Sequence, residues 1–206
     1  CLQLQKLYSS AYAIPQENFE SLLDKNTSDD FRSNFESIES KSFAAASIGQ
    51  IHRAKLLDGT DVVIKIVKSN FEKSFRRDVR RMKRWVSMGL FFYPRLKKVG
   101  NPLGLLAHIE DYTVRELNLL NEIKGKEKLE KIATQYSDKF PMPKLRFPKF
   151  WKDISNERVL VVEYIAAPTL EKHLDRHSFE WDDMLQLFRI HGAYMFGIGV
   201  FHGDLH

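Results

Sequence analysis

Lys65 is the residue of this 206-residue chain whose place in the sequence most needs a chemical explanation. It interrupts the apolar run VVIKIV, where a strand normally carries valine or isoleucine. Burying an ammonium group is costly unless it meets an anion, so a carboxylate or a phosphate is the expected partner. The alternative is an edge-strand lysine whose long stem lets the charged head reach solvent.

A loop of small side chains precedes this strand. It contains Ala44, Ala45, Ala46 and Ser47, and it is followed by Gly49 and Gln50. Small side chains let backbone N–H groups approach phosphate oxygens, and Ser47 adds a hydroxyl donor. Consecutive alanines also occur where segments simply pack closely, so the loop alone does not decide the chemistry.

Two carboxylates downstream could neutralise Lys65. Glu116 and Glu122 lie in the segment VRELNLLNE, which we expect to be helical. A lysine held toward phosphates by a helix glutamate is a recurring device of kinases. The alternative is a solvated helix face on which these glutamates pair with neighbouring basic residues.

The segment RVLVVEYI ends in Glu163 and Tyr164. It is typical of the strand and hinge that join two lobes across an adenine pocket, and it is equally compatible with a plain core strand.

The last residues contain the motif HGDLH, in which Asp204 lies between two histidines. An aspartate there suits a group that accepts a proton from a hydroxyl during phosphoryl transfer. The same His-x-Asp-x-His spacing could instead hold a metal.

The elements that must position these residues predict an α+β fold. We expect strands over 48–56, 61–67, 144–151 and 158–165, with Asp58-Gly59 as a hairpin turn. We expect helices in the first forty residues and over 70–92, 105–130 and 181–200, from apolar residues spaced by three and four. This order indicates a mostly antiparallel sheet followed by the start of a helical lobe.

Composition and charge narrow the class of protein. With 43% hydrophobic and 29% charged residues the chain can bury a core, and a single cysteine excludes an internal disulfide and favours a reducing compartment. No apolar run is long enough to span a bilayer. The net charge is +5, yet the segment 65–100 holds twelve basic and two acidic residues. An anionic partner is therefore expected near this segment.

The helix expected over 70–92 carries most of this charge. Its basic residues are Arg76, Arg77, Arg80, Arg81, Lys83 and Arg84. A solvated face is one interpretation, and docking on an anionic membrane is the functional alternative, since a basic amphipathic helix can lie at the interface. Nucleic acid is a poorer candidate because no aromatic stacking platform accompanies the charges.

In their order and spacing, FAAASIGQIHRAKLLDGTDVVIK, RELNLLNE, RVLVVEYI and GVFHGDLH resemble the UbiB-type (AarF-like) atypical kinase family. The resemblance implies a protein-kinase-like N-lobe that binds ATP with Mg²⁺. It makes residues Ala44 to Ser47 the nucleotide loop, Lys65 the nucleotide-binding lysine, Glu122 its helix partner and Asp204 the catalytic-loop aspartate. Glu116 matches the glutamate of a Glu-x-Asp motif, whose aspartate is replaced by Asn118.

The resemblance also sets the expected organisation. We expect a helical extension over 1–41, the N-lobe over 42–165 and the start of a C-lobe over 166–206. The family's Lys-x-Gly-Gln motif, catalytic-loop asparagine and Asp-Phe-Gly aspartate have no match in residues 1–206, so we expect this stretch alone to be inactive.

The expected function is an ATP-dependent kinase or ATPase linked to isoprenoid quinone or lipid biology. Its expected location is the cytoplasm or a membrane surface, mitochondrial or plastid in a eukaryote. Two alternatives are a small-molecule phosphotransferase of the aminoglycoside or choline kinase type, and a catalytically silent, lipid-associated nucleotide-binding module.

Overall fold

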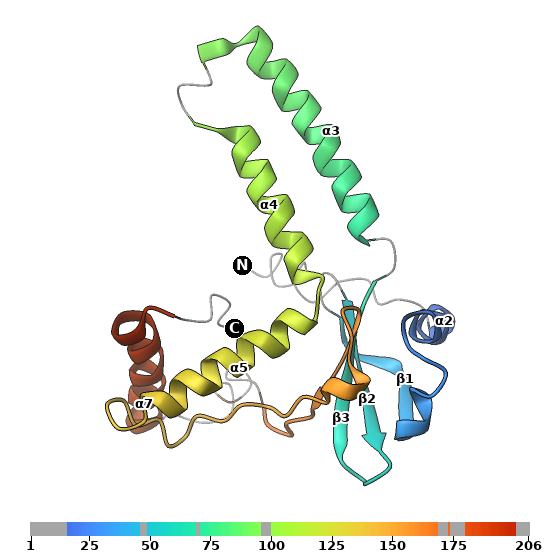
Figure 1. The fold of residues 1–206 in the computed structure, drawn as a ribbon, viewed down its shortest axis with the longest axis vertical. Coiled ribbons are helices and arrows are strands. Elements are labelled where there is room, and N and C mark those ends of the chain that lie inside the picture. Colours follow the sequence, from blue (N-terminus) through green and yellow to red (C-terminus); the bar gives the residue numbers. More distant parts are fainter. Residues whose placement is uncertain are drawn as a thin grey trace. The chain divides into compact units, whose positions relative to one another are not determined.

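The computed structural model describes residues 16–45, 49–68, 71–95, 100–168, 173 and 180–200 (Figure 1). Its helices are α2 (Gln16–Asn26), α3 (Phe71–Phe92), α4 (Pro102–Glu116), α5 (Leu120–Gln135) and α7 (Trp181–Gly192), with short turns η1 (Arg32–Asn34), η3 (Lys152–Ile154) and the π-helical η4 (Ala193–Ile198). Its strands are β1 (Phe35–Ala45), β2 (Gly49–Leu56), β3 (Asp61–Val67) and β4 (Val159–Glu163).

The four strands form one antiparallel sheet in the order β1-β2-β3-β4. The predicted turn between β2 and β3 is confirmed: Gly59 has a φ of 82°, which glycine adopts without steric cost, and the Asp58 carboxylate accepts a 2.9 Å hydrogen bond from the Thr60 N–H. The strands expected over 48–56, 61–67 and 158–165 are present with ends shifted by at most two residues. The α+β class with an antiparallel sheet is therefore confirmed.

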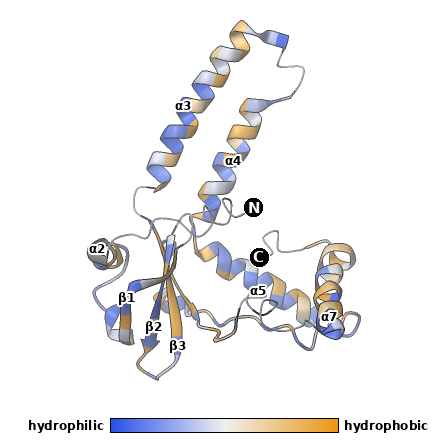
Figure 2. Ribbon diagram, turned by 180° about the vertical axis from the view of Figure 1, so that it is seen from behind, coloured by the Kyte–Doolittle hydropathy of each residue, from blue (hydrophilic) through white to orange (hydrophobic). Residues whose placement is uncertain are grey.

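One face of the sheet carries the hydrophobic core. On β3 the side chains of Val62, Ile64 and Ile66 are at most 1% exposed, and they alternate with residues of the opposite face. Helix α2 covers this core with Phe19 and Leu23, both fully buried. Figure 2 shows β3 as a largely hydrophobic strand. The part of the predicted N-terminal helix that falls on α2 is thus a helix that packs on the sheet.

The helix expected to continue to residue 41 is wrong, because residues 35–45 form strand β1. Phe35 pairs with Leu56, and Ile38 pairs with Ala54, with a bulge between them. The extra residue puts both side chains on the core face although they are three positions apart. A bulged strand therefore produced the spacing that predicted a helix.

The strand expected over 144–151 is also wrong. In that segment the structure has a single bridge, between Phe150 and Val162. Pro148 has no N–H to donate, and proline is disfavoured inside a sheet. The fourth strand of the sheet is β1 instead.

Two predicted helices are each divided. The helix expected over 105–130 breaks where the Asn118 side-chain oxygen accepts a 3.0 Å hydrogen bond from the Leu120 N–H, which separates α4 from α5. The helix expected over 181–200 changes from α7 to η4 and ends at Gly199, which has a φ of 77°.

Helices α3 and α4 lie side by side as a hairpin (Figure 1). Glu110 of α4 joins them, since its carboxylate lies 2.6 Å from Lys83 Nζ and 3.6 Å from Arg76 Nη1 of α3. Of the six basic residues named above for α3, Arg76 and Lys83 are therefore half-buried and paired with Glu110 of α4. The other four, Arg77, Arg80, Arg81 and Arg84, are exposed.

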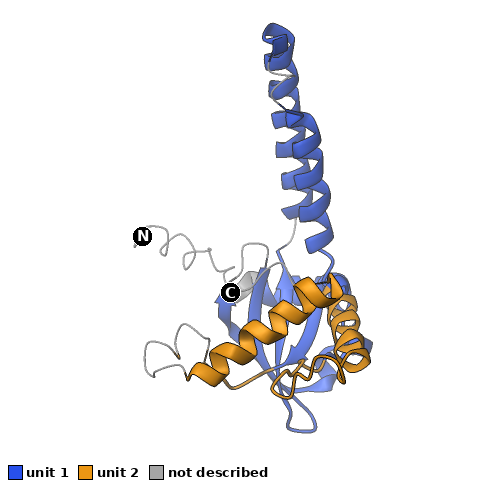
Figure 3. Cartoon of the chain, turned by 90° about the vertical axis from the view of Figure 1, so that its left-hand side faces the viewer, with its two compact units in different colours: residues 1–121, 150–163 blue, residues 122–149, 164–206 orange. Residues whose placement is uncertain are grey.

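The chain divides into two compact units (Figure 3). One comprises residues 1–121 and 150–163, which include the sheet, and the other comprises 122–149 and 164–206. Among the described residues no helix has the length and apolarity needed to cross a membrane.

Candidate functional site

One row of residues runs straight across the sheet and joins the alanine-rich loop to Lys65. Ala44 of β1 pairs with Ile51 of β2, Ile51 pairs with Lys65 of β3, and Lys65 pairs with Leu160 of β4. Directly paired residues point to the same face, and neighbouring strands lie about 4.8 Å apart. The backbones of Ala44 and Lys65 are therefore roughly 10 Å apart on the face opposite the core.

The described ends of the alanine-rich loop are the adjoining ends of the two strands of the β1–β2 hairpin. Ala45 ends β1 and pairs with Gln50, and β2 begins at Gly49. A Cβ at Gly49 would lie 2.5 Å from the Ile66 carbonyl oxygen, so only glycine lets β2 start this close to β3. This close approach fixes the base of the loop against the lysine strand.

The face that carries Lys65 is cationic. Lys65 is half-buried, and Arg53 of β2 lies on the same face directly opposite Val63. The Arg53 guanidinium lies 4.6 Å from the centre of the Phe43 ring on β1, a cation–π contact that holds it over the sheet. Two positive side chains on the sheet face that also carries Ala44 make an environment suited to phosphate.

On the core face, beneath the same hairpin, lies a polar pair that the sequence analysis missed. Gln50 and His52 are fully buried, and the Gln50 Oε1 lies 3.2 Å from the His52 Nε2. The His52 Nδ1–H donates a 2.9 Å hydrogen bond to the Glu39 carbonyl, and its ring stacks on Phe19 of α2 at 3.5 Å. Burial lowers the pKa of His52, so the ring is neutral near pH 7.

This polar pair holds a bulge in β1. Ile38 pairs with Ala54 and Ser42 with His52, so β1 has two more residues than β2 over this interval. His52 binds the carbonyl of Glu39 within that bulge. Helix α2 binds it as well, since the Ser40 hydroxyl donates a 2.9 Å hydrogen bond to Glu20. The path of β1 into the alanine-rich loop is therefore fixed by His52 and α2.

The two candidate glutamates lie near the α4–α5 corner. Glu116 is the last residue of α4, and Glu122 is in the first turn of α5; both side chains are exposed. Glu122 and Lys65 belong to different compact units. The pairing of Lys65 with either glutamate stays a prediction.

Asn118, which replaces the aspartate of the Glu-x-Asp motif, takes part in a turn. Its Nδ2 donates a 3.3 Å hydrogen bond to Glu157, and the Leu119 N–H donates a 2.9 Å bond to the Glu157 carbonyl. A carboxylate at position 118 would face the Glu157 carboxylate instead, so the amide suits this corner electrostatically.

The expected hinge residues mark a division in the structure. Glu163 ends β4 and pairs with Val62, and the boundary between the two compact units falls between Glu163 and Tyr164.

Three expected site residues, Ala46, Ser47 and Asp204, lie outside the described residues. Within the described ranges no group of three or more His, Cys, Asp or Glu side chains could hold a metal ion.

A solved structure shares this fold. The chain is similar to a Mycobacterium tuberculosis protein solved in complex with erythromycin, with a TM-score of 0.64 and 22% sequence identity over 90% of this chain and 46% of that one. This similarity concerns the fold.

The sequence comparisons define the family. Residues 6–206 match the model of the ABC1 atypical kinase-like domain, so the chain belongs to that family. It is 24% identical to AarF domain-containing protein kinase 1 of Xenopus laevis over 98% of the chain and 38% of that protein. It is 30% identical to the probable protein kinase UbiB of Serratia proteamaculans over 84% of the chain and 31% of that protein. The chain thus spans about a third of the length of these relatives.

Proposed function

We propose that this domain binds ATP in an atypical kinase or ATPase, with the alanine-rich hairpin and Lys65 on the phosphates. The row Ala44-Ile51-Lys65-Leu160 carries the proposal, because it sets a half-buried lysine on the same sheet face as the base of the loop. The loop residues 44–47 would offer backbone N–H groups and the Ser47 hydroxyl, and Lys65 a fixed positive charge. Arg53 adds a second charge to that face.

The other expected residues complete the proposed site. Glu122, or else Glu116, would orient Lys65, the backbone of Glu163 and Tyr164 would meet the adenine ring, and Asp204 would accept the proton of the attacking hydroxyl. Kinase-like proteins take ATP with Mg²⁺, which neutralises phosphate charge. The described residues by themselves do not fit a magnesium site, so the roles assigned here belong to the protein side chains and backbone.

The test is nucleotide binding by the full-length protein with Lys65→Ala. A fluorescent ATP analogue and unlabelled adenosine are titrated in parallel. Losing the lysine should weaken ATP binding by about tenfold or more, because a charge-assisted hydrogen bond is worth about 1.5–3 kcal/mol, and should leave adenosine binding unchanged. Lys55→Ala is the matched control: Lys55 lies on the same face of β2 but opposite Asp61, away from the loop. Equal ATP affinity in wild type and Lys65→Ala would contradict the proposal.

We further propose that the α3–α4 hairpin docks on an anionic membrane. Arg77, Arg80, Arg81 and Arg84 are exposed on α3, and its far end exposes Phe91, Phe92 and the following Tyr93, each by at least 67%. Figure 2 shows that α3 is mainly hydrophilic near its start and hydrophobic at its far end. Basic residues gain about 1 kcal/mol each near an anionic surface, and aromatic residues favour the interface.

Liposome flotation tests the membrane proposal. The triple variant Arg80→Gln, Arg81→Gln, Arg84→Gln should lose binding to vesicles that contain phosphatidylserine. The control removes three exposed charges of α5 instead, as Lys124→Gln, Lys128→Gln and Lys131→Gln. Equal binding of wild type to anionic and neutral vesicles would contradict the proposal.

A further inference from the structure

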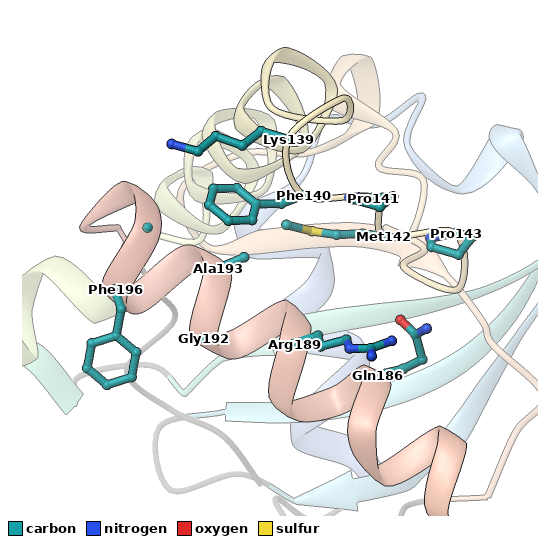
Figure 4. Close-up of a pocket in the computed structure, with 11 residues that line it drawn as sticks. Lys139, Phe140, Pro141, Met142, Pro143, Gln186, Arg189, Gly192, Ala193 and Phe196 are labelled. Atoms are coloured by element: carbon teal, nitrogen blue, oxygen red, sulfur yellow. The ribbon is translucent and has the colours of Figure 1, made fainter.

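Two surface features of the described residues lie apart from the proposed nucleotide site. One is a hollow of about 710 Å³ between the segment 139–143 and helix α7, whose lining combines Phe140 and Met142 with the exposed Arg189 (Figure 4). This mixed lining selects no class of ligand. The other is an exposed apolar flank of the α3–α4 hairpin, which has a more definite composition.

Buried residues mark the seam along which α3 and α4 pack. Val79 and Leu90 of α3 and Leu106 of α4 are each at most 9% exposed. On one side of this seam the Lys83 ammonium of α3 lies 2.6 Å from the Glu110 carboxylate of α4. Successive residues of an α-helix are about 100° apart around its axis, so the residues that precede Lys83 and Glu110 lie on the other side of the seam.

That other side of the seam is apolar and exposed. Its side chains, each at least 44% exposed, form the apolar flank: Met82 and Trp85 of α3, and Leu105, Ile109 and Tyr112 of α4. They are three or four positions apart within each helix and therefore share a face. The helices run in opposite directions (Figure 1), so Trp85 and Ile109, which follow and precede the paired residues, lie at nearly the same level. A continuous exposed strip of this kind marks an interaction surface.

Charge indicates what kind of partner covers the apolar flank. Residues 79–109, the outer part of the hairpin, contain no aspartate or glutamate but seven basic residues: Arg80, Arg81, Lys83, Arg84, Arg95, Lys97 and Lys98. Arg81 lies four positions before Trp85 and so beside it at the rim of the flank, where its 3.6 Å pair with Asp78 is exposed to solvent. A second copy of this chain would bring equal positive charges together, which disfavours it as the partner.

A bilayer with anionic headgroups matches both the apolar flank and its charge. Its acyl chains accept apolar side chains, tryptophan and tyrosine favour the headgroup level, and the long side chain of an arginine at the rim can reach lipid phosphates. Helix α3 advances about 15 Å from Met82 to Phe92. The flank is therefore long enough for the hairpin to lie along the membrane surface.

We propose that the outer part of the α3–α4 hairpin lies flat in the headgroup layer of an anionic bilayer, with the apolar flank toward the acyl chains and Arg81 beside the lipid phosphates. This inference rests on the proposed membrane docking and adds the face that docks. A hairpin that inserted only its tip would bury Phe91 and Phe92 and leave Trp85 in water.

Brominated lipids test the position of Trp85, because bromine quenches tryptophan fluorescence only at short range. The full-length protein is added to phosphatidylserine vesicles whose phosphatidylcholine is either unmodified or brominated near the top of its acyl chains. Bromine should quench part of the wild-type fluorescence. Trp85→Phe keeps an apolar ring, so it should keep vesicle binding but lose that part of the quenching. Trp181→Phe is the matched control, since Trp181 is 74% exposed on α7 and its loss should leave the quenching in place.

Vesicle flotation provides the second arm. The flank variant Trp85→Gln with Ile109→Gln should bind phosphatidylserine vesicles about tenfold or more weakly, because it removes two side chains that the bilayer buries. Leu57→Gln with Phe188→Gln is the control, since these side chains are 70% and 69% exposed elsewhere and should leave binding unchanged.

The outcomes separate the docking face from docking itself. If the wild type floats but Trp85→Phe retains the full quenching, or if the flank variant binds as tightly as the wild type, the flat orientation is overturned and membrane docking stands. A wild-type protein that does not float with anionic vesicles would overturn both.

Discussion

His52→Phe tests whether the buried polar pair beneath the hairpin stabilises the domain. Phenylalanine keeps the stacking on Phe19 but removes the ring nitrogens. The Glu39 carbonyl then loses the 2.9 Å bond from the imidazole, and Gln50 loses its 3.2 Å contact. The bulge in β1 should therefore be held less firmly, and with it the entrance to the alanine-rich loop.

The magnitude follows from the one hydrogen bond removed, the bond from the Nδ1–H of the neutral ring to the Glu39 carbonyl. A hydrogen bond contributes about 1 kcal/mol net, so we expect the free energy of unfolding to fall by about 1 kcal/mol at pH 7.5. The difference should shrink in acid. Burial lowers the pKa of His52 below its ordinary value of 6.5, so below pH 6.5 the unfolded chain takes up a proton that the native ring does not. Wild-type stability should then fall by up to about 1.4 kcal/mol per pH unit, and the variant lacks this loss.

Urea unfolding at pH 7.5 and pH 5.5 measures both effects, and amide hydrogen exchange localises the change. Exchange should accelerate in residues 39–51 of the variant. His108→Gln is the control, since His108 is exposed on α4. A wild-type-to-variant difference that is the same at both pH values would refute the assignment of the depressed pKa to His52, and unchanged exchange in 39–51 would refute its positioning role.

Three further substitutions have defined outcomes. Gly49→Ala should lower the free energy of unfolding by about 1–3 kcal/mol, because the new Cβ would lie 2.5 Å from the Ile66 carbonyl oxygen. The control Gly125→Ala places its Cβ in open space and should not lower it. Equal melting temperatures of the Gly49→Ala and Gly125→Ala variants would contradict this prediction. Asn118→Asp should destabilise the α4–α5 corner at pH 7 by about 0.5–1 kcal/mol through repulsion from Glu157, with recovery at pH 4; a pH-independent effect would argue against the mechanism. The pKa of Glu110 lies below its ordinary value of 4.5, mainly because of the hydrogen bond from Lys83 and in smaller part because of the charge of Arg76. The ion pair of Glu110 therefore stabilises the α3–α4 hairpin above pH 4.5, and this stabilisation is lost as acid protonates the carboxylate. Glu110→Gln should remove this acid dependence from thermal melts, whereas Glu36→Gln should retain it.

The sequence predicted those helices and strands in which the spacing of apolar residues is the regular one for that element. The β2–β3 hairpin follows from Asp58-Gly59 between two β-rich apolar runs, and α3 follows from apolar residues three and four apart. The sequence misled where local pattern and tertiary structure disagree. Bulges in β1 gave Phe35 and Ile38 a helix-like spacing, and no rule of period two detects a strand that contains extra residues.

The candidate site was predictable in part. A lysine in an apolar strand is visible in the sequence, but its row partners Ala44 and Leu160 depend on strand order and register. Gln50 and His52 could have been found, because they lie at two-residue intervals from Ala54 and therefore share its buried face of β2. A polar residue on a buried face is the informative exception, and here it marks the support of the loop.

The most direct test of the nucleotide site is covalent labelling of the full-length protein with an ATP acyl phosphate. A lysine held beside the phosphates attacks the acyl group and becomes acylated, and mass spectrometry identifies it. We expect ATP-competed labelling at Lys65, with Lys55 and Lys68 unlabelled although they lie nearby in the sequence. Labelling confined to other lysines, or labelling of Lys65 that excess ATP does not reduce, would contradict it.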